Sequence, residues 1–142
     1  MLIGRICAVV LLLAAGITGA AQAQLTVNIE QGTINPAPIA VPEFAPVEDI
    51  ETPTGKLSDI GASISQVITS NLVSTGLFRA IDPNAFIEKI TAAPTRPRFA
   101  AWRPLGVQAL VTGRLEMLPN GNLRVEFRLW DVVAEVQMEG VG

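Results

Sequence analysis

Residues 107–132 read VQALVTGRLEMLPNGNLRVEFRLWDV and are the most regular stretch of this 142-residue chain. Two runs, 109–116 and 123–130, alternate side chains with the two-residue period of a β-strand that buries one face. The face predicted to be buried carries Ala109, Val111, Gly113, Leu115, Leu123, Val125, Phe127 and Leu129. Between the runs, Pro119-Asn120-Gly121-Asn122 supplies the positive φ angles of a tight reversal. The stretch predicts an antiparallel hairpin, which needs cover on its apolar face because a strand pair alone is marginally stable.

A helix with one apolar stripe is predicted to provide this cover. Ser58 is the expected N-cap, the helix runs to about Thr75, and Gly76 follows as a left-handed stop. The stripe that recurs at helical spacing consists of Leu57, Ile60, Ile64, Val67, Ile68 and Leu72. We therefore expect this helix to pack on the hairpin and to form the main core.

Shorter elements complete the predicted domain. The pattern indicates a buried strand within 36–42, a strand at 78–81, a two-turn helix from Asp82 to Ile90, one helical turn at 99–103 and a third hairpin strand from Val136. These elements predict an α/β fold, a small mixed or antiparallel sheet covered by helices. The last strand breaks off at Gly142, so we interpret the sequence as truncated at its C-terminus.

The first 23 residues are interpreted as a cleaved secretory signal. A short basic start is followed by an apolar run from Ile6 to Ile17, and Ala21-Gln22-Ala23 offers small residues where a signal peptidase cuts. The run is too short for a stable membrane-spanning helix, although a retained anchor is the alternative. The predicted organisation is a signal peptide at 1–23, an N-terminal tail at 24–35 and an α/β domain at 36–142. A periplasmic location is the resulting expectation.

Residues 25–30 form an isolated alternating segment directly after the predicted cleavage site. Its residues are Leu25, Thr26, Val27, Asn28, Ile29 and Glu30. One interpretation is an edge strand of the domain's own sheet. The other is a segment that binds a second protein by strand addition, which needs only an extended donor and an open sheet edge. Both remain open from the pattern alone.

The composition argues against enzymatic chemistry. The chain has no histidine, and its one cysteine, Cys7, lies within the predicted signal. Ser–His and Cys–His nucleophiles and the usual zinc ligands are therefore excluded from the mature chain, and no phosphate-binding glycine loop is present. The acidic residues of 43–56 are read as a solvated loop rather than a general acid–base pair; they are Glu43, Glu48, Asp49 and Glu51. We predict no catalytic residues, no cofactor and no metal site.

Nucleic-acid binding is not expected either. Arg96, Arg98 and Arg103 lie near Phe99 and Trp102, but an acidic, exported domain is a poor partner for phosphate backbones. We expect the arginines to form a solvated rim and Trp102 to lie in the core.

Several of these segments together resemble the TolB family of the Tol-Pal envelope system. The segments that carry the resemblance are 38–44 (PIAVPEF), 60–61 (IG), 71–82 (NLVSTGLFRAID), 99–103 (FAAWR), 108–113 (QALVTG) and 125–132 (VEFRLWDV). The resemblance covers nearly all of the chain after residue 23, in order and spacing. The segments 74–79 and 127–132 are its most specific parts.

The resemblance implies an anticodon-binding-domain-like α/β domain, followed in the family by a six-bladed β-propeller that is absent here. It implies a TolA-like inner-membrane partner for Leu25–Glu30, and a Pal-like lipoprotein that contacts only the missing propeller. The implied function is a protein–protein interaction module needed for outer-membrane integrity and for invagination during cell division. The acidic insert from Pro46 to Gly55 departs from the family, where the loop is shorter.

An alternative function class shares a similar strand–helix opening. It comprises exported assembly or activator subunits of the curli-secretion or penicillin-binding-protein-activator type. Those lipoproteins carry a lipidated cysteine at the end of the signal, where this chain has Ala23-Gln24. The alternative is therefore weaker than the TolB resemblance.

Overall fold

The computed structural model describes residues 35–91 and 96–142. The predicted segment Leu25–Glu30 lies outside these residues. The described chain forms, in order, β1 (Ala37–Ala40), β2 (Ala45–Pro46), β3 (Glu51–Thr52), β4 (Gly55–Lys56), α2 (Leu57–Ser74), β5 (Phe78–Ala80), the 3₁₀ turn η1 (Pro83–Ala85), α3 (Phe99–Trp102), the 3₁₀ turn η2 (Arg103–Leu105), β6 (Ala109–Met117), β7 (Leu123–Asp131) and β8 (Val136–Val141).

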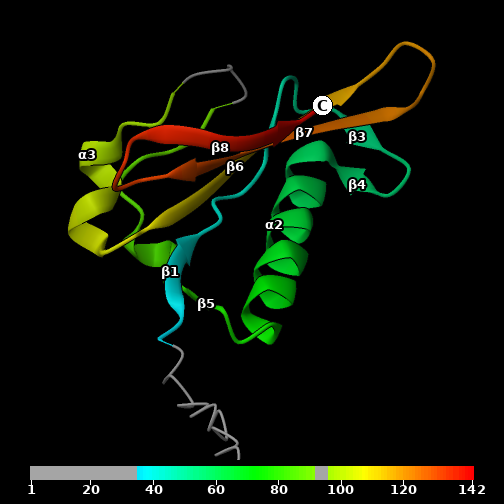
Figure 1. The fold of residues 1–142 in the computed structure, drawn as a ribbon. Helices are drawn as coiled ribbons and strands as arrows, with labels where there is room; N and C mark the ends of the chain where they lie inside the picture. The colour runs from blue at the N-terminus through cyan, green and yellow to red at the C-terminus, as the bar shows by residue number, and fades with distance from the viewer. Residues whose placement is uncertain (1–34, 92–95) are drawn as a thin grey trace, which may run out of the picture. The chain divides into compact units, whose positions relative to one another are not determined.

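The main sheet is mixed, with the order β5-β1-β6-β7-β8. β1 is parallel to both β5 and β6, whereas β6, β7 and β8 form an antiparallel meander (Figure 1). β2 extends the β1 side of the sheet by pairing with the far half of β6. The predicted hairpin is confirmed as β6 and β7, and the predicted strands within 36–42, at 78–81 and from Val136 are confirmed as β1, β5 and β8. The prediction of an α/β fold with a small mixed sheet is likewise confirmed.

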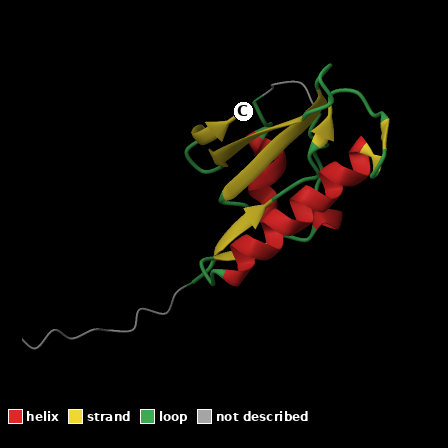
Figure 2. Cartoon of the chain, turned by 90° about the vertical axis from the view of Figure 1, so that its right-hand side faces the viewer, coloured by secondary structure: helices red, strands yellow, loops and turns green. Residues whose placement is uncertain are grey.

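α2 lies along one face of the sheet, as predicted (Figure 2). Its apolar stripe, which includes the buried Leu57, packs on residues from β1, β6 and the β1–β2 connection: Ile39, Val41, Phe44, Val111 and Leu115. The prediction was wrong for Val67, whose side chain is 60% exposed. Val67 precedes Ile68 in the chain, and the turn of about 100° per residue moves it from the sheet to the flank of the helix.

The N-terminus of α2 is capped by Asp49 rather than by Ser58. Asp49 accepts hydrogen bonds from the backbone N–H of Ser58 at 2.9 Å and from the Ser58 hydroxyl at 3.0 Å. Lys56 occupies the N-cap position and makes no side-chain cap. The predicted capping residue was therefore wrong, because a carboxylate from the preceding loop accepts the Ser58 N–H, one of the helix N–H groups that have no partner within the helix.

Small residues let α2 approach the chain that follows β1. A Cβ placed on Gly61 would lie 2.0 Å from the backbone oxygen of Phe44, so only glycine fits there. One turn later, the Ser65 hydroxyl accepts a hydrogen bond from Phe44 N–H and lies 2.9 Å from the carbonyl oxygen of Pro42, to which it donates. These contacts fix the helix against the β1–β2 connection.

The opposite face of the sheet is also covered, which the hairpin pattern did not predict. A second core joins Ala40, Phe99, Trp102, Val107, Leu110, Trp130 and Val132. Leu110, Thr112 and Trp130 alternate with the residues predicted to be buried and so fall on the other face of the hairpin, yet all three are buried. The Trp130 indole N–H donates to the Thr112 hydroxyl, so burial leaves neither group unpaired. Trp102 lies in this core, as predicted.

Two residues of β7 are less buried than predicted. Leu123 and Phe127, expected on the covered face, are each 37% exposed. Val125 and Leu129 of the same strand pack against the core under α2, whereas Leu123 and Phe127 are not among the residues that pack against it. At the turn, only Gly121 has a positive φ, of 82°, while Asn120 orients Asn122 through its side chain. The turn is therefore a wider loop, closed by Leu118 and Asn122, rather than a two-residue Asn-Gly reversal.

Two loop predictions also need correction. The predicted two-turn helix from Asp82 to Ile90 is wrong: only η1 forms, with Asp82 capping Asn84 N–H, and Ile87 is 66% exposed. The loop at 43–56 is acidic but not wholly solvated, because Phe44 is buried and β3 and β4 form a small second sheet. The one-turn helix at 99–103 is confirmed as α3.

Candidate interaction site

The predicted partner-binding segment precedes β1 in the sequence and lies outside the residues that the structure describes. Residues 31–36 connect Leu25–Glu30 to the first residue of β1, Ala37, which donates a backbone hydrogen bond to Leu77.

Among the described residues, β8 forms one end of the main sheet. All six of its residues are exposed, including the apolar side chains of Val136, Met138 and Val141. An edge strand of this kind presents backbone N–H and C=O groups that no other described strand pairs. Within residues 35–91 and 96–142, the structure thus provides an open sheet edge at β8.

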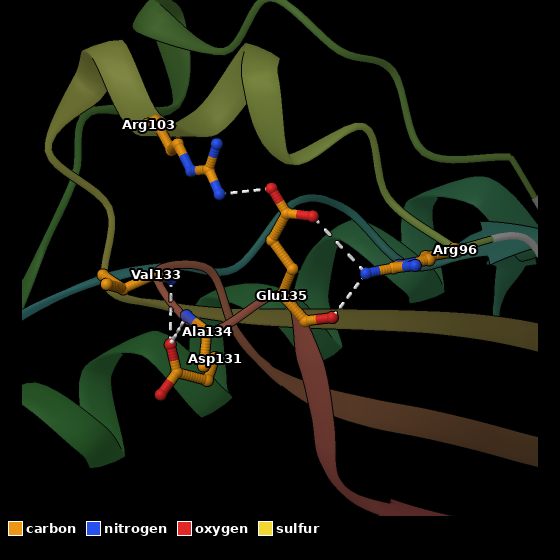
Figure 3. A network of polar contacts seen from close by, with 6 residues as sticks. All are labelled: Arg96, Arg103, Asp131, Val133, Ala134 and Glu135. Carbon is orange, nitrogen blue, oxygen red and sulfur yellow. Dashed lines mark hydrogen bonds and ion pairs between the residues drawn. The ribbon is translucent and has the colours of Figure 1, made fainter.

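The turn between β7 and β8 is held by a polar network (Figure 3). Asp131 accepts hydrogen bonds at 2.8 Å from the backbone N–H groups of Val133 and Ala134. Glu135 has a φ of 58°, which is unusual for a residue other than glycine. Its carboxylate pairs with Arg96 and Arg103, and Arg96 also lies 5.0 Å from the ring centre of Phe99. The predicted arginine rim therefore exists, and it fastens the β8 side of the sheet to the α3 region.

Glu88 fastens a second loop to α3. Its side chain is 11% exposed and accepts hydrogen bonds from the Trp102 indole N–H at 2.5 Å and from the backbone and side chain of Arg98. No sequence motif points to this role of Glu88, which stands beside Lys89 between apolar residues while its partner Trp102 lies 14 residues away.

Two ion pairs cross the hairpin on its polar face: Arg114–Glu126 and the more exposed Arg124–Glu116, 3.8 Å apart. Arg114 on β6 faces Glu126 on β7, and the Arg114 side chain donates to the Glu126 carboxylate. This hydrogen bond lowers the pKa of Glu126 and raises the pKa of Arg114 from their ordinary values. Both effects stabilise the charged forms and hold the strand register, without preparing either group for proton transfer.

The four acids of the 43–56 segment do not form a single site. Glu43, Glu48 and Glu51 are exposed, and Asp49 is engaged in capping α2. Within 35–91 and 96–142, no group of three or more acidic, cysteine or histidine residues is placed to hold a metal ion. The same ranges contain no helix long and apolar enough to cross a membrane.

A mixed sheet with an apolar core on each face, fastened by ion pairs at its loops, defines the class: a small α/β domain. The chain belongs to the TolB amino-terminal domain family, whose model matches residues 25–138. It is also 40% identical over 120 residues to the Tol-Pal system protein TolB of Paramagnetospirillum magneticum. That alignment covers 84% of this chain and 26% of the relative, so the chain spans about a quarter of the relative's length.

Solved structures show the same fold. TolB from Acinetobacter baumannii superposes with a TM-score of 0.52 at 17% identity, covering 75% of this chain and 22% of that chain. The C-terminal domain of LpoB from Escherichia coli gives a TM-score of 0.52 at 10% identity, with coverages of 78% and 82%. At these identities the likeness establishes the fold alone.

Proposed function

We propose that this chain acts in the periplasm as a protein–protein interaction module of a Tol-Pal envelope system. The observation that carries the proposal is the TolB amino-terminal domain match over residues 25–138. The 40% identity to a Tol-Pal system protein supports the same system. The apolar run that ends before Ala21-Gln22-Ala23 supports export.

The proposed binding segment is Leu25–Glu30, and the proposed partner is a TolA-like inner-membrane protein. The family match begins at Leu25, where the alternating segment also begins. Leu25, Val27 and Ile29 fall on one face of an extended strand, so they can fill apolar pockets while the backbone pairs with an open edge. A segment that lies against its own protein or pairs with a partner shifts between the two states by differential contacts.

Contact with a Pal-like lipoprotein is assigned to the propeller, which lies outside these residues. A tail that reaches one partner and a propeller that reaches another would link the inner and outer membranes. We propose on this basis a role in outer-membrane integrity and in envelope invagination during division. No nucleic acid, cofactor or catalytic residue enters the proposal.

The test is binding of the purified protein to the periplasmic part of its TolA-like partner, measured by calorimetry. Deletion of residues 25–32 should abolish binding and leave the melting temperature nearly unchanged. Intact binding by the deletion variant would overturn the assignment.

A matched pair of substitutions tests whether side chains of the segment are recognised, which the deletion of residues 25–32 cannot distinguish from loss of the backbone. Val27→Asp places a charge on the apolar face of the segment and should prevent binding, whereas Thr26→Ser on the other face should leave the affinity within about twofold. Equal affinities for these two variants would contradict recognition through one face of a strand.

The alternative, an exported assembly or activator subunit, receives no comparable support. The similarity to LpoB is at 10% identity and concerns the fold only.

A further inference from the structure

A cavity of about 710 Å³ lies beside α2, at the carboxyl ends of β1 and β5. Residues 41–43, which directly follow β1, form one wall, and residues 83–90, which follow β5, form another. In open α/β sheets, the crevice outside the carboxyl ends of parallel strands is where ligands bind. The volume lies within the range of small-molecule sites, roughly 300–1,000 Å³.

Part of the cavity lining is apolar and packed against the domain's core. Val41 is buried, and Phe86 packs edge-on against Trp102 with ring centres 5.1 Å apart. Phe86 and Ile90 also pack against the core beneath them. Such a surface favours small apolar groups on a ligand.

Two opposite charges line the same cavity without neutralising each other. Glu43 and Lys89 are both exposed, and among the described residues neither forms an ion pair within 4.0 Å. The Glu43 carboxylate and the Lys89 ammonium group are therefore too far apart to form an ion pair with each other. Glu88, the third charged lining residue, is already engaged by Arg98 and Trp102. The cavity thus offers one anionic and one cationic group to a ligand.

α2 adds an amide and a hydroxyl with hydrogen-bonding capacity. Gln66 and Ser70 both line the cavity and lie four residues apart, on the same face of the helix. Within the described part of the chain, neither side chain takes part in a hydrogen bond, whereas the hydroxyls of Ser65 and Thr69 donate to backbone carbonyls. A side-chain amide is complementary to a peptide group, since it has both a donor and an acceptor.

We propose that this cavity binds a short peptide with a free amino end and a free carboxylate end. Glu43 pairs with the ammonium group, Lys89 pairs with the carboxylate, and Gln66 bonds the intervening peptide group. The apolar lining accepts small side chains such as those of alanine. The proposal does not rest on the Leu25–Glu30 segment.

The experiment titrates the purified protein with trialanine and follows the backbone amides by NMR. The expected result is saturable shifts at Glu43, Gln66, Ser70 and Lys89. N-acetylation of trialanine should weaken binding to the unmodified protein about fivefold, the equivalent of an exposed ion pair, but should not weaken binding to Glu43→Gln. C-terminal amidation of trialanine should likewise weaken binding to the unmodified protein but should not weaken binding to Lys89→Gln. Glu48→Gln and Lys56→Gln, which change exposed charges outside the cavity, are the matched controls.

All four positions are exposed, so the variants should melt at the temperature of the unmodified protein. The proposal is overturned if trialanine produces no shifts up to about 10 mM, which lies beyond weak millimolar binding. It is also overturned if capped and free trialanine bind equally, or if Glu43→Gln and Lys89→Gln respond to capping as the unmodified protein does.

Discussion

At the scale of single residues, carboxylates fasten the loops of this domain to its core. Asp49 caps α2, Glu88 binds Trp102 and Arg98, and Glu135 pairs with Arg96 and Arg103. Each joins segments that are distant in sequence. The acidic balance of the chain therefore reflects structural ties as well as solvation.

Glu88→Gln should destabilise the domain by about 1–3 kcal/mol. Both carboxylate oxygens of Glu88 accept hydrogen bonds, and the amide replaces one acceptor with a donor that faces other donors. Chemical denaturation measures the change. Glu48→Gln, in an exposed loop, is the control and should shift the free energy of unfolding by less than about 0.5 kcal/mol. Equal stabilities of the two variants would show that the hydrogen bonds of Glu88 do not stabilise the domain.

The Arg114–Glu126 pair should make stability depend on pH in the acidic range. The pKa of Glu126 is lowered in the folded protein, chiefly by the hydrogen bond from Arg114. The pair therefore contributes fully above the unfolded-state pKa of glutamate, about 4.3, and its contribution is lost as the pH falls through the lower folded-state pKa.

Unfolding curves of the unmodified protein and Glu126→Gln, measured from neutral to acidic pH, check this sign. The stability difference should be present at neutral pH and should shrink below about pH 4.3. A difference that grows on acidification would contradict the assigned direction.

At the scale of elements, α2 shows how far sequence periodicity can predict packing. The helix and five of the six members of its stripe were correctly predicted, since Leu57 is buried in the core and Ile60, Ile64, Ile68 and Leu72 pack against it. Val67 fits the same periodicity within one residue, so the pattern alone could not exclude it. Only the position of the sheet decides which edge of an apolar stripe is covered.

Ile64→Asp and Val67→Asp therefore form a matched test. Ile64→Asp places a charge against the core and should cost more than about 3 kcal/mol, which unfolds a marginal domain. Val67→Asp should change stability by less than about 1 kcal/mol, because its side chain already faces solvent. Thermal melting compares them, and similar losses would mean that the sequence pattern was right about Val67.

The hairpin and the loops mark where prediction from sequence stops. The strands of β6 and β7 follow from alternation, but the burial of Leu110 and Trp130 depends on α3 and its neighbours packing on the second face. The helix expected at 82–90 does not form. Apolar residues of this segment pack against Trp102 and its core from a loop, so their burial does not require helical spacing. The candidate peptide cavity likewise joins Glu43 and Lys89, which no local motif connects. The segment Leu25–Glu30 remains a prediction from sequence.

At the scale of the whole α/β domain, the two cores share strands. Within β1, Ile39 belongs to the core under α2 and Ala40 to the opposite core; within β6, Val111 and Leu110 divide in the same way. Neither core can lose its packing without disturbing the strands that form the other. We therefore expect the domain to unfold as one cooperative unit.

The positions of the tryptophans make this expectation testable. Trp102 and Trp130 are the only tryptophans of the chain, and both lie in the core opposite α2. Tryptophan fluorescence therefore reports one core, whereas far-ultraviolet circular dichroism is dominated by α2 on the other face. The two denaturation curves should coincide. Ile64→Val, which removes one methylene from the α2 side, should shift both midpoints together by the equivalent of about 1 kcal/mol. A fluorescence midpoint that stays in place while the dichroism midpoint moves would show two units that unfold separately.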